Sequence, residues 1–183
     1  DSAPAVVPQE KKPLRRTAAW PVDRFSVIDP VWAGRTFVSI GGGPSLSEAD
    51  LGLIAEARRR DAVRVIAIND AYLVAPWADL CYFADARWWE WHSKGIAKSW
   101  PWAKFTAEEV RAAFAEFRGA KVTIDNTGMM VADPGVFMLH NGGVNGLSEV
   151  PKARKTGSNS GYQAINLATL AGARRVLLVA YDM

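Results

Sequence analysis

The sequence predicts an α/β fold: a Rossmann-like, doubly wound and mainly parallel sheet with helices on both faces, preceded by an extended N-terminal arm. Short, continuous apolar runs alternate along the chain with segments of helical periodicity, which is typical of a parallel sheet covered on both faces. The first 33 residues instead combine proline with basic residues and show no periodicity. We therefore expect an arm over residues 1–33 and a Rossmann-like domain over residues 34–183.

The bulk composition suits one globular domain with a core: 183 residues, 49% hydrophobic and 22% charged. The net charge of +3 is concentrated in the arm and near Lys152–Lys155 rather than in a broad stripe, so we expect no nucleic-acid partner. The single cysteine, Cys81, excludes an internal disulfide and favours a reducing compartment. Because the chain has no apolar run of ~18 residues and no signal-peptide pattern, we expect a cytoplasmic protein without a membrane partner.

The arm needs a surface to lie on, because it has no core of its own. That surface belongs either to its own domain or to a partner, which includes a second copy of the chain. Four hydrophobic residues are candidate anchors: Trp20, Phe25, Ile28 and Trp32. A solvated tail is the alternative interpretation.

The first half of the domain follows a regular order. An apolar run predicts a strand over 36–40, and a helix over 47–60 follows, where Ser47 and Asp50 resemble a capping box. Further apolar runs predict strands over 63–68 and 80–84. The helix expected next spans 86–96.

The second half continues the same alternation. A helix is expected over 106–117, with Gly119 ending it, and short apolar runs predict strands over 122–124 and 136–139. The last helix spans 158–171, and a strand over 176–180 follows. The sequence stops at Met183, where a doubly wound fold normally continues, so it reads as part of a longer protein.

The turn after the first strand is the leading candidate site. Its residues are Gly41, Gly42, Gly43, Pro44 and Ser45. A strand that runs through glycines into a helix N-terminus favours an anion, because backbone N–H groups can approach it and the helix dipole attracts it. The turn matches neither a Walker A loop nor the complete dinucleotide pattern. A plain tight turn is the alternative.

Ligands of such sheets bind outside the carboxyl ends of the strands. This rule groups the glycine turn with Asn69–Asp70, Asp85 and Tyr181–Asp182, because each follows a predicted strand. The Asn69 amide can donate and accept, which suits a base edge or a ribose. An Asx-type turn explains Asn69 and Asp70 equally well.

A tryptophan-rich segment follows Asp85. On a helix, Trp88, Trp91 and His92 are expected to share one face, where the tryptophans stack on a substrate ring and His92 carries a proton. The alternative is that the tryptophans pack against the domain or a partner and His92 is structural. With only His92 and His140 and no Cys/His spacing, we expect no metal site.

The start of the last predicted helix is rich in hydroxyl and amide side chains. Residues 156–164, including Ser160 and Gly161, form a second helix start that favours an anion. Two such starts flanking one crevice suit a nucleotide with its phosphate. The glycine-rich loop over 141–146 is expected to act as a lid.

These motifs, in this order, resemble the Rossmann-type core of the bacterial family-42 sialyltransferases. They are equally similar to the related domain of unknown function 115, which includes the archaeal pterin pyrophosphokinases. Small phage proteins, some of them labelled morphogenetic, are more similar still. The resemblance covers Phe37–Met183 in scattered blocks: Ile40–Leu46, Ile68–Asn69, Ser158–Gly161, Gly172–Leu178 and Tyr181–Asp182.

The resemblance implies a cytidine nucleotide held by Gly43, Pro44, Ser45 and Asn69, with Ser160 and Gly161 at the phosphate-side helix. Two departures concern this chain. Gly42 stands where the family has asparagine, and the family's histidine base lies beyond the Tyr–Asp strand end, whereas this sequence ends at Met183. The resemblance therefore supports a nucleotide site more strongly than it supports catalysis.

Two functions follow as hypotheses. The first is a nucleotide-binding, transferase-like domain that moves a glycosyl or phosphoryl group from a cytidine or other nucleotide donor. Its expected nucleotide contacts are Gly41, Gly42, Gly43, Pro44, Ser45, Asn69, Asp70, Ser160 and Gly161, and its acid–base candidates are Asp85, His92 and Asp182. The second is a phage structural or morphogenetic protein that docks virion partners through residues 1–33 and the tryptophans. The location is then the host cytoplasm or the virion.

Overall fold

The computed structural model describes residues 14–16, 26–28, 30, 32–125, 135–149, 153–157 and 159–182. The strands of the main sheet are β3 (Thr36–Ile40), β4 (Val63–Ile68), β5 (Leu80–Tyr82), β6 (Ala120–Ile124), β7 (Val136–Asn141), β8 (Ala153–Arg154) and β9 (Arg175–Val179). The helices are α1 (Glu48–Arg59), α2 (Ala71–Val74), α3 (Ala86–Ser93), α4 (Ala107–Glu116) and α5 (Ser160–Leu170).

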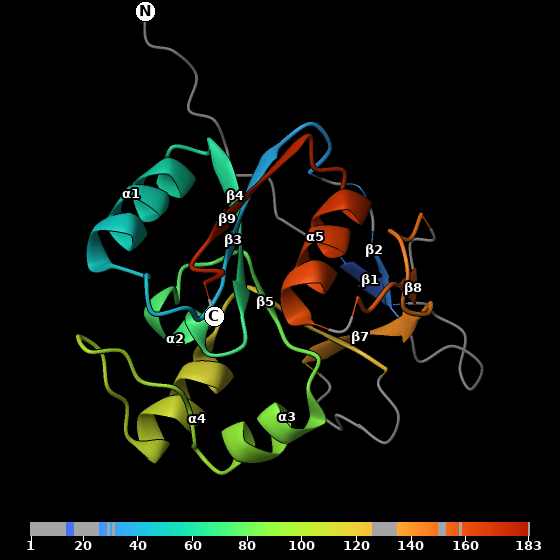
Figure 1. The fold of residues 1–183 in the computed structure, drawn as a ribbon. Coiled ribbons are helices and arrows are strands. Elements are labelled where there is room, and N and C mark those ends of the chain that lie inside the picture. The colour runs from blue at the N-terminus through green and yellow to red at the C-terminus, as the bar shows by residue number, and fades with distance from the viewer. Residues whose placement is uncertain are drawn as a thin grey trace, which may run out of the picture.

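The seven strands lie in the order β8-β7-β6-β5-β4-β3-β9, and each neighbouring pair is parallel. Helices cover both faces of this sheet (Figure 1). The predicted α/β, Rossmann-like fold is therefore confirmed. The predicted strands and helices are all present, with shifted ends, whereas α2 and β8 are too short to leave a periodic signal and were not predicted.

Two hydrophobic cores lie on the two faces of the sheet. One core packs α1, α2, α3 and α4 against the sheet and includes Leu51, Tyr72 and Phe114. The other packs α5 against the opposite face through Ala164 and Leu167. All six residues of β4 are buried, because this strand has helices on both faces and a paired strand on each side.

The described part of the expected arm packs onto the domain itself. Strands β1 (Leu14–Arg16) and β2 (Ser26–Ile28) pair antiparallel. Ile28 is 2% exposed and Trp32 is 4% exposed, and both belong to the core that α5 covers. Trp20 and Phe25 lie outside the described residues. Two of the four candidate anchors therefore contribute to the core of the domain.

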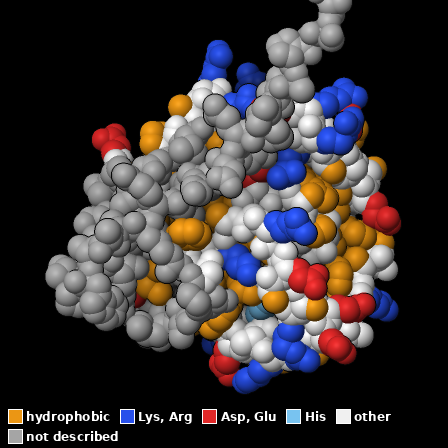
Figure 2. Space-filling model, turned by 180° about the vertical axis from the view of Figure 1, so that it is seen from behind, with side chains coloured by type: hydrophobic (Ala, Val, Ile, Leu, Met, Phe, Trp, Pro, Cys, Tyr) orange, Lys and Arg blue, Asp and Glu red, His pale blue; other side chains and the backbone are white. Residues whose placement is uncertain are grey.

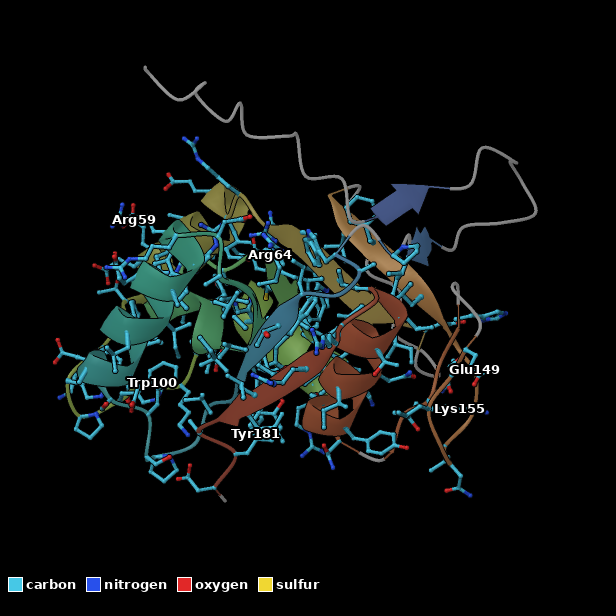
Figure 3. The ribbon with its side chains drawn as sticks, turned by 90° about the horizontal axis from the view of Figure 1, so that it is seen from above. Arg59, Arg64, Trp100, Glu149, Lys155 and Tyr181 are labelled. Carbon is cyan, nitrogen blue, oxygen red and sulfur yellow. The ribbon has the colours of Figure 1, made fainter. Side chains whose placement is uncertain are left out.

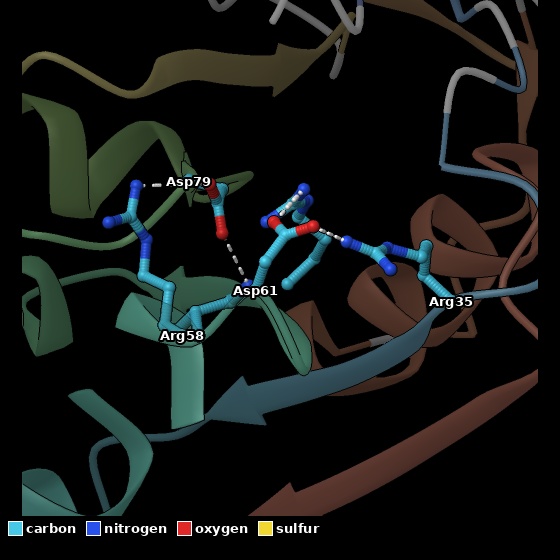
Figure 4. A network of polar contacts seen from close by, with 6 residues as sticks. Arg35, Arg58, Asp61 and Asp79 are labelled. Carbon is cyan, nitrogen blue, oxygen red and sulfur yellow. Dashed lines mark hydrogen bonds and ion pairs between the residues drawn. The ribbon is translucent and has the colours of Figure 1, made fainter. Parts of the chain in front are cut away.

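Ion pairs secure the amino-terminal end of the sheet (Figure 4). The Asp79 carboxylate accepts hydrogen bonds from Arg58 at 3.1 Å and from the Val65 N–H at 3.0 Å. Asp61 pairs with both Arg35 and Arg64. These contacts join the end of α1 to the starts of β3 and β4.

The surface carries charges of both signs. Figure 2 shows Lys and Arg side chains scattered among acidic ones on the face seen from behind. Among the described residues, none of the helices has the length and apolar character needed to span a membrane.

The burial of Trp32 yields a stability prediction with an internal control. We expect Trp32→Ala to lower the free energy of unfolding by about 3–5 kcal/mol, because it empties a core site against Phe37, whose ring centre lies 5.4 Å away. Trp91 is 49% exposed, so Trp91→Ala should cost about 1 kcal/mol or less. Urea unfolding of both variants is the measurement. Equal losses would contradict this placement of Trp32.

Candidate functional site

The glycine turn lies directly against the chain that leaves β9. The Gly41 N–H donates to the Val179 carbonyl at 2.8 Å, and the Gly43 N–H donates to the Ala180 carbonyl at 2.9 Å. A Cβ on Gly41 would lie 2.3 Å from the Ala180 oxygen, and one on Gly43 would lie 2.5 Å from Asp182 Oδ1. Two of the glycines are therefore required by close packing of the chain against itself.

Ser45 is bound to a carboxylate of the same chain. Its N–H donates to Asp182 Oδ2 at 3.0 Å, and its hydroxyl donates to Asp182 Oδ1. These hydrogen bonds hold the pKa of the Asp182 carboxyl below its ordinary value. The Asp182 carboxylate, which is an anion of the chain itself, thus occupies the N–H and hydroxyl of Ser45, two donors of the turn that the sequence predicts to bind a phosphate.

The N-terminus of α1 lies beyond this turn and is already capped. Ser47 accepts a hydrogen bond from the Asp50 N–H at 3.1 Å, and its hydroxyl donates to the Asp50 carboxylate at 2.5 Å. The capping is therefore not reciprocal as in a capping box. Glu48 and Asp50 place negative charge in the first turn, where the helix dipole would otherwise attract a ligand anion.

Asn69 and Asp70 follow β4 and differ in their partners. Asn69 has a left-handed backbone (φ 50°), and its buried Oδ1 has no hydrogen-bond partner within the described part of the chain. The Asp70 carboxylate accepts from the Trp88 indole at 2.8 Å and from the Lys98 N–H at 2.7 Å. Burial raises the pKa of Asp70. Asp70 therefore orders the neighbouring segments, whereas Asn69 retains an unused acceptor.

The segment between α3 and α4 brings Lys98 to the glycine turn. No sequence pattern predicted this contact. The Lys98 ammonium donates to the Gly42 carbonyl and lies 5.9 Å from the ring centre of Trp100. Trp102 donates to the Leu46 carbonyl at 3.2 Å. The only available signal was the clustering of tryptophans, which did not single out Lys98.

The N-terminus of α5 reaches the same edge of the sheet through Tyr181. The Tyr181 hydroxyl and the Ser39 hydroxyl are 2.7 Å apart, and a Cβ on Gly161 would lie 2.5 Å from the Tyr181 ring. Ser160 begins this helix, and Asn159 caps it by accepting from the Tyr162 N–H. Figure 3 shows Tyr181 and Trp100 toward one end of the sheet and Arg64 toward the other. Ser158 lies outside the described residues.

Of the two acid–base candidates near α3, only Asp85 is exposed. Asp85 caps the helix by accepting from the Arg87 N–H at 2.8 Å. His92 is 2% exposed, and its Nε2 lies 2.6 Å from the Tyr72 hydroxyl. The structure therefore places His92 in the core beneath the site.

The prediction that Trp88, Trp91 and His92 share one helix face is wrong for Trp91. Trp88 and His92 stack with ring centres 4.4 Å apart and are buried, whereas Trp91 is 49% exposed. Trp89 takes its place, stacked on Phe83 at 5.3 Å. The core lies on the Trp88–Trp89 side of α3, so the position three residues beyond Trp88 faces solvent.

The loop expected as a lid borders the start of α5. Its Gly143 carbonyl accepts from Thr156, and its Gly146 carbonyl accepts from the Tyr162 hydroxyl at 2.7 Å. Lys155, labelled in Figure 3, donates to the Gly142 carbonyl at 2.5 Å. Within the described ranges, His, Cys, Asp and Glu residues form no group of three or more that could hold a metal ion.

The structure thus joins the glycine turn, Asp70, Lys98 and Asp182 in one hydrogen-bonded group, with Asn69 adjoining it in sequence. Tyr181 links the same edge to Ser160–Gly161. Comparisons with protein-family models, with curated proteins and with solved structures find no match for this chain.

The close approach at the glycine turn can be tested with alanine. Gly41→Ala should lower the free energy of unfolding by more than about 2 kcal/mol, because the new methyl group would overlap the Ala180 carbonyl. Gly52 lies within α1 with open space around it, so Gly52→Ala should raise that free energy by about 0.5–1 kcal/mol. Chemical unfolding measures both. A stabilising Gly41→Ala would contradict the contact.

The burial of His92 predicts a pH dependence of stability. Burial lowers the pKa of His92 to about 4 from an ordinary value of 6.5. As the pH falls from 6.5 toward 4, the unfolded chain takes up a proton that the folded chain does not, so stability is lost in that window. The loss of stability between pH 6.5 and pH 4 should be smaller in His92→Gln than in the unaltered protein. Thermal unfolding followed across this pH range measures it. An identical profile in both proteins would contradict the prediction.

Proposed function

We propose that this protein binds a mononucleotide at the carboxyl end of its sheet and moves a glycosyl or phosphoryl group from it. The observation that carries the proposal is the buried Oδ1 of Asn69 at the end of β4, which has no hydrogen-bond partner among the residues that the structure describes. A buried acceptor without a partner costs about 1–3 kcal/mol, which a ligand that donates a hydrogen bond recovers. A base amine or a ribose hydroxyl is such a donor.

The phosphate in this proposal lies between Lys98 and the glycine turn. Lys98 supplies the positive charge, and Ser45 supplies an N–H and a hydroxyl once a ligand phosphate displaces Asp182 from them. Ala180, directly before Tyr181, has a left-handed backbone (φ 56°), which is uncommon for alanine and strained. That strain favours a rearrangement of the chain at this point when a ligand binds.

Asp85 and Asp182 are the acceptor-side groups of the proposed reaction. Asp85 is exposed after β5. In this proposal the phosphate displaces Asp182 from Ser45, which removes the hydrogen bonds that lower the Asp182 pKa and makes its carboxylate a stronger base. His92 contributes indirectly in this proposal. It stacks on Trp88, which in turn donates to Asp70, so it positions the wall of the site.

One observation favours the second candidate, a phage structural or morphogenetic protein that keeps the fold without catalysis. The donors of Ser45 are satisfied by Asp182, and Gly41 and Gly43 pack against the chain after β9. These motif residues therefore have structural roles without any ligand.

Nucleotide titration separates the two candidates. We expect cytidine monophosphate, or another nucleoside monophosphate tested in parallel, to bind in calorimetry. Lys98→Ala and Asn69→Gly should each weaken binding about 10-fold or more, because each removes one polar contact. Glycine tolerates the positive φ of residue 69, so Asn69→Gly leaves the backbone unstrained.

Lys94→Ala is the matched control, because Lys94 is exposed and pairs with Glu90 on α3. It should bind like the unaltered protein. Two results would reject the proposal and favour the structural candidate. One is that no nucleotide binds at millimolar concentration, and the other is that Lys98→Ala and Asn69→Gly bind nucleotide as tightly as the unaltered protein.

A further inference from the structure

Two tryptophans follow Lys98 in the segment that borders the glycine turn, and their indole N–H groups differ in how they are satisfied. The Trp102 indole N–H donates to the Leu46 carbonyl at 3.2 Å. The indole Nε1 of Trp100 is buried and has no hydrogen-bond partner within the part of the chain that the structure describes. Trp100 as a whole is 2% exposed. A donor left unsatisfied at this depth costs free energy that an acceptor on another molecule would recover.

The Trp100 ring is held in place by its neighbours. The Trp100 backbone N–H donates to the Ala103 carbonyl at 2.8 Å, and the Ala103 N–H donates back at 3.1 Å. The rings of Trp100 and Trp102 lie 6.0 Å apart, centre to centre. Trp100 also belongs to the core that α1 to α4 cover. Because cores are closely packed, the ring cannot turn to find a partner in the protein without disturbing these neighbours.

Lys98 links Trp100 to the candidate site. The Lys98 ammonium lies over the Trp100 ring, 5.9 Å from its centre, and donates to the Gly42 carbonyl. The backbone N–H of Lys98 donates to the Asp70 carboxylate at 2.7 Å. Figure 3 shows Trp100 toward the same end of the sheet as Tyr181. The unsatisfied N–H therefore belongs to the ring beneath the ammonium that the proposed function assigns to a ligand phosphate.

We infer that the Trp100 indole donates a hydrogen bond to the phosphate of the bound nucleotide and thereby distinguishes a nucleotide from the free nucleoside. This inference rests on the proposed function. The phosphate draws the Lys98 ammonium away from the Gly42 carbonyl, which uncovers the edge of the Trp100 ring. An indole N–H only donates, so it suits a phosphate oxygen and offers nothing to an amine. A hydrogen bond to a charged oxygen is also stronger than one to a neutral acceptor.

Replacing the indole N–H by sulfur tests the inference while keeping the shape of the side chain. Benzothienylalanine in place of Trp100 has such a group, and Trp100→Phe is the genetically encoded counterpart. We expect the dissociation constant of cytidine monophosphate in calorimetry to rise about 10-fold or more, because a hydrogen bond to a charged oxygen is lost. The dissociation constant of cytidine, which has no phosphate, should stay unchanged. If a different nucleoside monophosphate binds, that nucleotide and its nucleoside form the pair to compare.

Unfolding of the free protein separates a ligand contact from a structural one. Because the Trp100 indole N–H has no partner among the described residues, benzothienylalanine at this position should not lower the urea midpoint. The same replacement of Trp102 is the matched control, since it removes the hydrogen bond to Leu46 and should lower the midpoint. Equal falls at the two positions would overturn the inference, because the Trp100 N–H would then stabilise the free fold.

The binding results distinguish a failure of this inference from a failure of the proposed function. If no nucleoside monophosphate binds the unaltered protein, the proposed function fails and the inference fails with it. If binding depends on Lys98 and Asn69 but is unchanged by benzothienylalanine in place of Trp100, only the inference is overturned. Equal losses for cytidine monophosphate and cytidine would also overturn it, because the N–H would then contact the nucleoside and not the phosphate.

Discussion

The structure depends on the close approach of the glycine turn to the chain that leaves β9. Two backbone hydrogen bonds, from Gly41 and Gly43, join the end of β3 to Val179 and Ala180. Only glycine leaves room for this contact, because any Cβ would overlap the Ala180 oxygen. The contact fixes the end of β9 against the end of β3, and it also places Asp182 on Ser45. The same constraint therefore determines both the fold at this edge and the chemistry of the candidate site.

The sequence predicts the strands and longer helices well, because apolar runs and capping residues act locally. Ser47 and Thr106 each cap the helix that follows them. Contacts between distant segments leave no such pattern. Lys98 contacts Gly42, which lies 56 residues away in the sequence, and no local sequence pattern predicts this contact. The direction in which α3 faces the core decides that His92 is buried and Trp91 exposed, and periodicity alone did not reveal which side that is.

Ser45 and Asn69 show how differently neighbouring polar groups at one edge of the sheet are satisfied. The Ser45 donors have an internal partner, so the folded chain gains from them without a ligand. The Asn69 acceptor has none among the described residues, so its burial carries a cost that a bound donor would remove. A group whose hydrogen bond is incomplete is the more informative evidence for binding, even though the glycine turn is the more conspicuous motif.

The pairing of β3 with β9 also has a consequence for synthesis on the ribosome. Ser45 and Asp182 are separated by 137 residues, so the contact that completes this edge forms long after β3 has been made. At ordinary translation rates that interval is roughly 7–30 s. During it, β3 has an open edge on the side that β9 later occupies, and a nascent chain with such an edge is exposed to mispairing. Until β9 is made, the N–H groups of Gly41 and Gly43 lack the carbonyls that they bind in the folded protein, so this part of the growing chain stays incomplete.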